Sequence, residues 1–202
     1  MKIFVTGYHR AGTHQAAEYL ATKNGVDLYY ENRIRWDSLE AAFMLADGLS
    51  PKWSEEGKLT GVSDSRLKRK GFVLQCPGLA HNVLELSKVG NVYWCSRAMV
   101  DVITSMKNAG INEMAWHLMK GFHDRFPDDP IWPTLSYDGS QDIHDGFVRY
   151  YKLLIQVKQY FYETRFKDVA EKIVMEQMPY YDKGKALTTV KPLKRREYEA
   201  VR

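Results

Sequence analysis

The sequence predicts an α/β protein in three layers, with a central parallel β-sheet flanked by helices. Two continuous apolar runs, 71–76 and 91–96, have the length and composition of strands that are buried on both faces of a parallel sheet. Helical patterns alternate with the strand-like runs, which is the order that builds such a sheet. With 202 residues, 45% of them hydrophobic, we expect one domain over 1–202, with a basic, flexible tail over about 186–202.

Each predicted element has a local reason. The first strand, over 3–6, is β-branched and aromatic and leads directly into a glycine turn. The next helix, over 13–23, should end at Asn24-Gly25, because glycine favours the C-terminal cap. Further strands are predicted over 26–30, 71–76, 91–96 and 171–176, and further helices over 38–48, 79–88, 99–108, 111–126 and 142–166. The polar, glycine-punctuated stretch 49–70 is expected to be a loop or lid, and the proline-rich stretch 127–137 a loop.

Composition and charge limit the classes of function. No run of 18 apolar residues and no signal-peptide pattern is present, so we expect no membrane partner and a cytoplasmic protein with reduced, buried Cys76 and Cys95. The net charge of +4 is concentrated from residue 183 onward, where seven Lys or Arg face two Glu. Such a tail can bind nucleic acid or an anionic ligand, or remain solvated. A nucleic-acid partner is the less favoured of these interpretations.

The most informative segment is GYHRAGTH, residues 7–14. A strand, a tight glycine turn and a helix N-terminus together bind phosphate, because backbone N–H groups and the helix dipole converge on one anion. The loop departs from the nucleotide-kinase pattern G-x-x-x-x-G-K-[ST], since Thr13 stands in the place of the lysine and His14 in the place of Ser or Thr. The positive charge lies earlier, at Arg10, and His9 is a further loop residue that could approach a ligand.

A second group of polar residues follows the strand over 91–96. Arg97 ends this strand, and Asp101 and Ser105 lie four residues apart on one face of the helix that follows. Ligands of open α/β sheets bind at the carboxyl ends of the strands. We therefore expect Arg97 and Ser105 to converge with Arg10 and Thr13 on one anionic ligand, for which guanidinium groups and hydroxyls are suitable partners.

Both segments resemble motifs of the PAPS-dependent sulfotransferases. GYHRAGTH is similar to that family's 5′-phosphosulfate loop, P-[KR]-[SA]-G-T-[TS], and NVYWCSRAMVDVITSM is similar to its 3′-phosphate motif. The late aromatic helix and the EKIVMEQM segment occupy the places of the family's late helix and strand, so the resemblance covers about residues 2–180. It implies a P-loop sulfotransferase fold. It also implies transfer of a sulfuryl group from PAPS to a hydroxyl or amine of a small-molecule, sugar or peptide acceptor, leaving PAP, without a metal.

The resemblance also implies roles for individual residues. The 5′-phosphosulfate would be held by Arg10, Ala11, Gly12, Thr13 and His14, the 3′-phosphate by Arg97 and Ser105, and a late basic loop would be represented by Lys183 and Lys185. The family's Asp-Pro pair after the strand-end arginine is replaced by Ala98-Met99.

The general base that the resemblance implies is Glu31. The histidine that many members carry before the 3′-phosphate strand is absent, since the matching stretch is LQCPG with Gln75. The YYENR segment instead resembles the GEETR of the tyrosylprotein sulfotransferases, with Arg33 as a supporting cation. Arg10 and His14 complete the expected catalytic group. A carboxylate between basic residues is expected to stay ionised and to accept a proton.

Two other classes of function remain open at this level. One is a divergent P-loop nucleotide or metabolite kinase, against which the missing lysine argues. The other is a P-loop-fold binding or structural protein without catalysis. No histidine spacing predicts a metal site.

Overall fold

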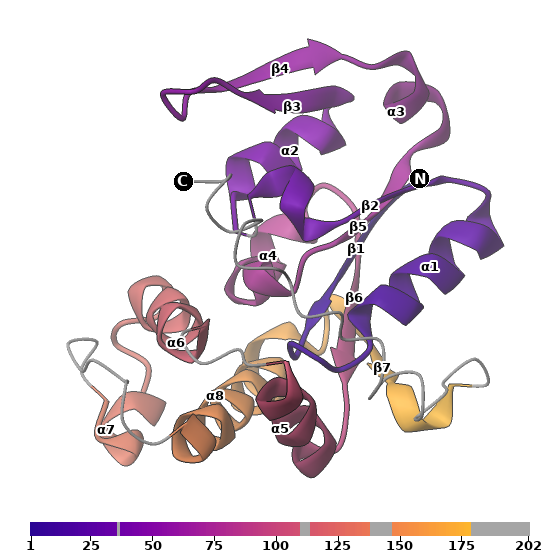
Figure 1. The fold of residues 1–202 in the computed structure, drawn as a ribbon. Coiled ribbons are helices and arrows are strands. Elements are labelled where there is room, and N and C mark those ends of the chain that lie inside the picture. Colours follow the sequence, from indigo (N-terminus) through magenta and orange to yellow (C-terminus); the bar gives the residue numbers. More distant parts are fainter. Residues whose placement is uncertain (36, 110–113, 138–146, 179–202) are drawn as a thin grey trace.

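A five-stranded parallel sheet forms the centre of the fold, in the order β2-β5-β1-β6-β7 (Figure 1). This computed structural model describes residues 1–35, 37–109, 114–137 and 147–178. The strands of this sheet are β1 (Lys2–Gly7), β2 (Asp27–Tyr29), β5 (Phe72–Gln75), β6 (Asn91–Ser96) and β7 (Ala170–Val174). The prediction of an α/β fold around a parallel sheet is confirmed.

Helices cover both faces of the sheet. They are α1 (Thr13–Asn24), α2 (Leu39–Ala46), α3 (Ser65–Lys70), α4 (Val83–Leu86), α5 (Met99–Asn108), α6 (Met114–Arg125), α7 (Ile131–Leu135) and α8 (Phe147–Phe161). Helix α1 lies on one face, whereas α4, α6 and α8 lie on the other (Figure 1). Shorter turns are the 3-10 segments η1 (Glu31–Ile34), η2 (Pro77–Asn82) and η4 (Met175–Gln177), and the π-helical turn η3 (Tyr162–Phe166).

The strand order places the ends of β1 and β6 at a topological switch point. The chain leaves β1 toward β2 on one side of the sheet, and it leaves β6 toward β7 on the other side. Because the two connections diverge, a crevice opens beyond the carboxyl ends of these adjacent strands, which is where open α/β sheets bind ligands. The loop after β1 and the residues that follow β6 therefore define the first region to search for a site.

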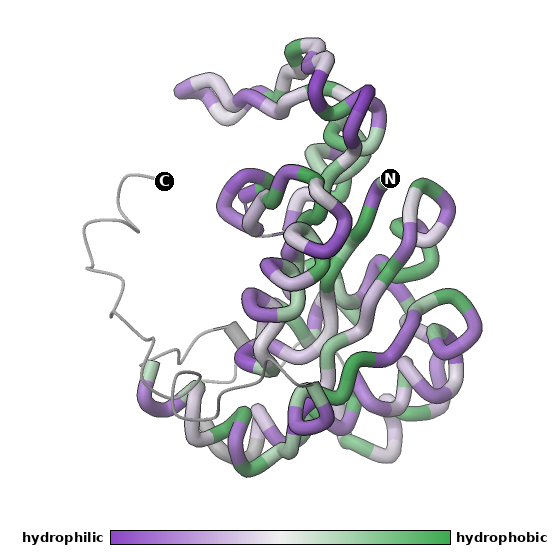
Figure 2. Tube along the Cα trace, turned by 90° about the vertical axis from the view of Figure 1, so that its right-hand side faces the viewer, coloured by the Kyte–Doolittle hydropathy of each residue, from purple (hydrophilic) through white to green (hydrophobic). Residues whose placement is uncertain are grey.

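Burial explains why the apolar runs became strands. Every residue of β5 is buried, as are Phe4, Trp94 and Cys95 on its neighbours, so side chains on both faces of the sheet meet helices. Hydrophobic residues accordingly run along the central strands (Figure 2). Cys76 and Cys95 are free and buried, as predicted, and burial raises the pKa of both thiols.

Several predicted elements have the predicted boundaries. Strand β6 and helix α5 match residue for residue, and α1 ends at Gly25, whose φ of 62° is the left-handed conformation of a C-terminal cap. Helix α2 begins after Ser38, whose hydroxyl accepts a hydrogen bond from the Ala41 N–H at 3.2 Å.

The prediction of a loop over 49–70 is wrong. This stretch forms an antiparallel hairpin of β3 (Leu49–Trp53) and β4 (Leu59–Ser63), followed by α3. Its turn closes through the Gly57 N–H bond to the Ser54 carbonyl, at 3.0 Å. Pro51 is tolerated because a two-stranded ribbon leaves one side of each strand without a ladder partner. The hairpin packs on α2 beside the main sheet rather than within it (Figure 1).

Three further expectations need smaller corrections. The helix predicted over 79–88 is the η2 turn, which is kinked at Leu79 where ψ is 18°, followed by the short α4. The proline-rich stretch 127–137 is not only loop, since it contains α7, whose preceding Pro130 has helical φ and ψ. The long helix is α-helical to Phe161 and continues as the π-turn η3. In the described ranges, no helix is long and apolar enough to cross a membrane.

Candidate anion-binding site at the ends of β1 and β6

The loop between β1 and α1 is anchored to the neighbouring strand. The Tyr8 N–H donates to the Cys95 carbonyl at 3.0 Å, and the Ala11 N–H donates to the Tyr8 carbonyl at 3.3 Å. Helix α1 begins after Gly12 without a side-chain cap, and Ala16 N–H donates to the Gly12 carbonyl. The N–H groups that precede this bond have no acceptor within the helix, so they are available to an anion above the loop.

Replacing Gly7 by alanine should lower the free energy of unfolding by about 3 kcal/mol or more. Gly7 has a φ of 116°, and a Cβ there would lie 2.2 Å from the Cys95 carbonyl oxygen. The matched control is Gly25→Ala, since Gly25 also has positive φ but a Cβ there meets no atom within 4 Å, so its expected cost is about 1–2 kcal/mol. Urea denaturation of both variants measures the difference. Equal losses would mean that the loop readily moves away from β6.

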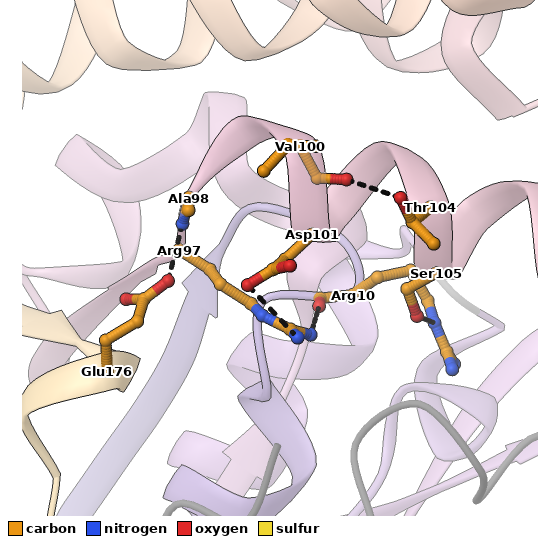
Figure 3. Close-up of polar contacts among 8 residues, drawn as sticks. All are labelled: Arg10, Arg97, Ala98, Val100, Asp101, Thr104, Ser105 and Glu176. Atoms are coloured by element: carbon orange, nitrogen blue, oxygen red, sulfur yellow. Dashed lines mark hydrogen bonds and ion pairs between the residues drawn. The ribbon is translucent and has the colours of Figure 1, made fainter. Parts of the chain in front are cut away.

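Two arginines and a serine meet at the switch point (Figure 3). Arg10 Nε donates to Ser105 Oγ of α5 at 3.0 Å. Arg97 leaves the end of β6 and donates from one guanidinium nitrogen to the Arg10 carbonyl at 3.3 Å, while another lies 3.7 Å from Asp101 Oδ2. The structure thus brings together Arg10, Arg97 and Ser105, three of the four residues that the sequence predicted to converge. The fourth, Thr13, accepts a hydrogen bond from Gln75.

Arg10 is held in an unusual backbone conformation. Its φ is 61°, in the left-handed region that few residues other than glycine adopt. The bond from Arg97 to its carbonyl and the bond from its side chain to Ser105 both hold it there. Burial and the charge of Arg97 lower the pKa of the Arg10 guanidinium. Two cations close enough for one to lower the pKa of the other create a positive potential at this end of the sheet, which favours an anionic ligand.

The start of α5 is completed by a distant residue. Ala98 carries no capping side chain, and instead Glu176 Oε1 of η4 accepts a hydrogen bond from the Ala98 N–H at 2.6 Å (Figure 3). A carboxylate at this place interacts favourably with the helix dipole. Glu176, which follows β7, therefore supplies the capping oxygen that the Ala98 side chain lacks.

A second row of polar residues runs from α1 to η1. Gln75, buried at the end of β5, donates from Nε2 to Thr13 Oγ1 at 3.0 Å. Its Oε1 accepts from the Glu31 N–H at 3.5 Å. The Glu31 side chain is buried with only 8% of the residue exposed, and its Oε2 has no hydrogen-bond partner within the described part of the chain. Gln75 thus links the loop helix to the predicted base.

The ionisation state of Glu31 differs from the expectation. Burial raises its pKa to about 8, against the opposing effects of the Gln75 hydrogen bond and the charges of Lys158 and Arg10. This shift favours the protonated carboxyl group near pH 7 in the ligand-free protein, whereas the sequence led us to expect that neighbouring cations keep it ionised. Desolvation exceeds the attraction because the group is almost wholly removed from water.

Lys158 is a site residue that the sequence analysis missed. It lies on α8, 1% exposed, and its ammonium donates to the Gly7 carbonyl at 2.6 Å and lies 3.3 Å from His9 Nδ1. Burial lowers its pKa to about 7, although Glu31 opposes this shift. A lysine in helical register with the buried Tyr151, Leu154 and Phe161 was a detectable signal, since a solvated lysine does not belong on an apolar face.

The remaining predicted residues are placed less centrally or lie outside the description. Ala11 is fully buried in the loop, and the exposed His14 stacks on Tyr30 with ring centroids 4.9 Å apart. Although the His14 side chain is exposed, partial desolvation and the charge of Arg10 lower its pKa. Arg33 is exposed and donates to Ser50 Oγ of the hairpin at 2.8 Å, so it extends away from Glu31. Lys183, Lys185 and the basic tail over 186–202 lie outside the described residues.

Fold and site together define an α/β protein with a cationic cluster at the switch point of a parallel sheet. Among the side chains that the structure describes, no group of three metal-ligating residues occurs. No known family model matches the chain, and no curated protein matches it.

Proposed function

We propose that the protein has a P-loop sulfotransferase-like fold and transfers a sulfuryl group from PAPS to a hydroxyl or amine. The observation that carries this proposal is the convergence of Arg10 and Arg97, from the ends of adjacent parallel strands, with Ser105 of α5. A kinase loop would carry a lysine where Thr13 stands. A site that has two guanidinium groups and no such lysine is better suited to a ligand with two separate anionic groups than to the triphosphate of a kinase substrate.

The donor set fits both anionic ends of PAPS. The uncapped start of α1 and Arg10 would hold the 5′-phosphosulfate, with Thr13 and His14 beside them. Arg97 and Ser105 would hold the 3′-phosphate, for which a guanidinium fork and a hydroxyl are apt. In the structure Ser105 accepts from Arg10, so this contact would be exchanged for contacts of both residues with the ligand.

Glu31 and Arg10 would carry the chemical step. The acceptor oxygen or nitrogen forms a bond to sulfur, the bond from sulfur to the 5′-phosphate oxygen breaks, and Glu31 takes the acceptor proton. Charge grows on the leaving oxygen of PAP, where Arg10 and the loop N–H groups would stabilise it. Glu31 must be ionised to act, and the negative charge of a bound ligand would oppose its ionisation. The cations Lys158 and Arg10 favour the ionised form.

Calorimetric titration with PAP, beside ADP with and without magnesium, is the experiment that tests this function. PAP should bind at least 100-fold more tightly than ADP, because only PAP carries the 3′-phosphate that Arg97 and Ser105 would contact. Magnesium should leave both affinities unchanged. Magnesium-dependent ADP binding would support a kinase instead. No binding of any of the three would reject the proposal and favour a non-catalytic role.

A further inference from the structure

His9 carries a buried hydrogen-bonding atom that no residue in the described ranges satisfies. The residue lies in the loop between β1 and α1 and is 9% exposed, and its Nε2 has no hydrogen-bond partner among the residues that the structure describes. Leaving such an atom unpaired away from water is unfavourable, so buried polar atoms without partners are rare in native proteins. The missing partner is best sought in a ligand or a bound water.

Lys158 decides which nitrogen of the ring carries the proton. Its Nζ lies 3.3 Å from His9 Nδ1 and donates to the Gly7 carbonyl. Below the Lys158 pKa of about 7 this group is an ammonium, which has donors and no acceptor, so under these conditions Nδ1 must accept from it. In a neutral imidazole the proton then resides on Nε2. Burial and the charges of Lys158 and Arg10 lower the pKa of His9 well below its usual value, which keeps the ring neutral.

We propose that His9 is a further ligand-contacting residue, whose Nε2–H donates to an oxyanion held on the loop, and that Lys158 is the residue that positions it. The ligand class is a tetrahedral oxyanion, as a 5′-phosphate group or as free phosphate. Arg10, adjacent to His9, and the uncapped start of α1 favour an anion over water as the partner. The inference rests on the anion site of the proposed function but not on sulfuryl transfer.

Nitrogen NMR of the full chain with labelled histidines tests the tautomer directly. The six histidines are few enough to assign, and the His9 signals are those that His9→Gln removes. We expect Nδ1 to be unprotonated and Nε2 to be protonated in the free protein. Lys158→Met should abolish this preference, a spectroscopic change that a merely structural lysine would not cause. The opposite tautomer in the wild-type protein would overturn the proposal.

Ligand binding tests the contact. Titration with PAP, and separately with inorganic phosphate, should shift the His9 Nε2–H signal. His9→Leu should weaken binding about tenfold or more, whereas His9→Gln, whose amide can donate from a similar place, should retain most of the affinity. His123→Leu is the matched control, because its ring on α6 packs against Trp132 of α7 and against Tyr137, which follows α7, and it should bind as the wild type does.

Failure of this inference and failure of the proposed function can be told apart. If PAP does not bind but phosphate shifts the His9 signal, the sulfotransferase proposal falls and the oxyanion contact stands. If PAP binds and the His9 signal stays unchanged, the contact is overturned and Nε2 faces a buried water. If neither ligand shifts the signal, the contact is overturned as well. These readings use the wild-type protein, so they hold even if Lys158→Met does not fold.

Discussion

Arg97→Ala should weaken PAP binding by at least 100-fold and lower the free energy of unfolding by about 3–5 kcal/mol. The Arg97 side chain is 1% exposed, pairs with Asp101 and donates to the carbonyl of the strained Arg10. Removing it leaves the Asp101 carboxylate without that partner and releases the loop that holds the ligand. Calorimetric titration and urea denaturation measure the two effects separately. Arg97→Lys keeps the charge but not the fork, so it should recover only part of the affinity.

A matched control separates the loss of binding from the loss of stability. Arg165 lies 3.1 Å from Asp129, whose side chain is also buried, and this pair connects η3 with the segment before α7. Arg165→Ala should therefore destabilise the fold without changing PAP affinity. A folded Arg97→Ala protein that binds PAP as tightly as the wild type would remove Arg97 from the 3′-phosphate site.

Glu31→Gln should lower turnover about 10²–10⁴-fold while leaving PAP affinity close to that of the wild type. The amide keeps the size of the side chain but cannot accept the acceptor's proton. Because burial raises the Glu31 pKa to about 8, wild-type turnover should rise as pH increases through this value. Initial rates from pH 6 to 9 measure both effects. Glu163→Gln, at an exposed carboxylate paired with Lys172, is the control and should not alter the rates.

Glu31→Gln should also change how the free energy of unfolding depends on pH. Between pH 4.5 and about 8 the unfolded chain has lost the Glu31 proton while the folded protein keeps it, so the wild-type free energy of unfolding falls as pH rises. Glu31→Gln removes this contribution. Its stability relative to the wild type should rise by up to about 5 kcal/mol over this interval. A constant difference in urea denaturation would mean that Glu31 is ionised beside Lys158 in the folded protein.

Local patterns were sufficient for the elements of the main sheet. Strand β6 and helix α5 have the predicted bounds, because a continuous apolar run and an apolar helical stripe are properties of neighbouring residues. The hairpin of β3 and β4 was missed because its strands lack a continuous apolar run and carry Pro51 and Gly61. Its pairing, Leu49 with Ser63 through Trp53 with Leu59, depends on contacts across the turn and with α2.

The residues of the candidate site likewise divide into those that the sequence could identify and those that it could not. Motif spacing was enough to find Arg10, Arg97 and Ser105. Arg10 and Arg97 follow the ends of two predicted strands, and Ser105 lies on one face of the helix after Arg97. Lys158 and Gln75 could not be assigned to the site, because α8 and β5 reach the loop only through the packing of the sheet. The protonation of Glu31 was mispredicted because sequence shows neighbouring charges but not the loss of water around them.

By itself, then, the sequence determined the alternation of main-sheet strands and helices along the chain and the loop chemistry of residues 7–14, because these follow from propensity, periodicity and short-range spacing. Only the tertiary structure brings Lys158 and His9 together: they are 149 residues apart in sequence, yet Lys158 Nζ lies 3.3 Å from His9 Nδ1. It is also the tertiary structure that buries Glu31 beside Gln75. Burial and long-range contact set the charge state of these groups, and both arise only when the chain has folded.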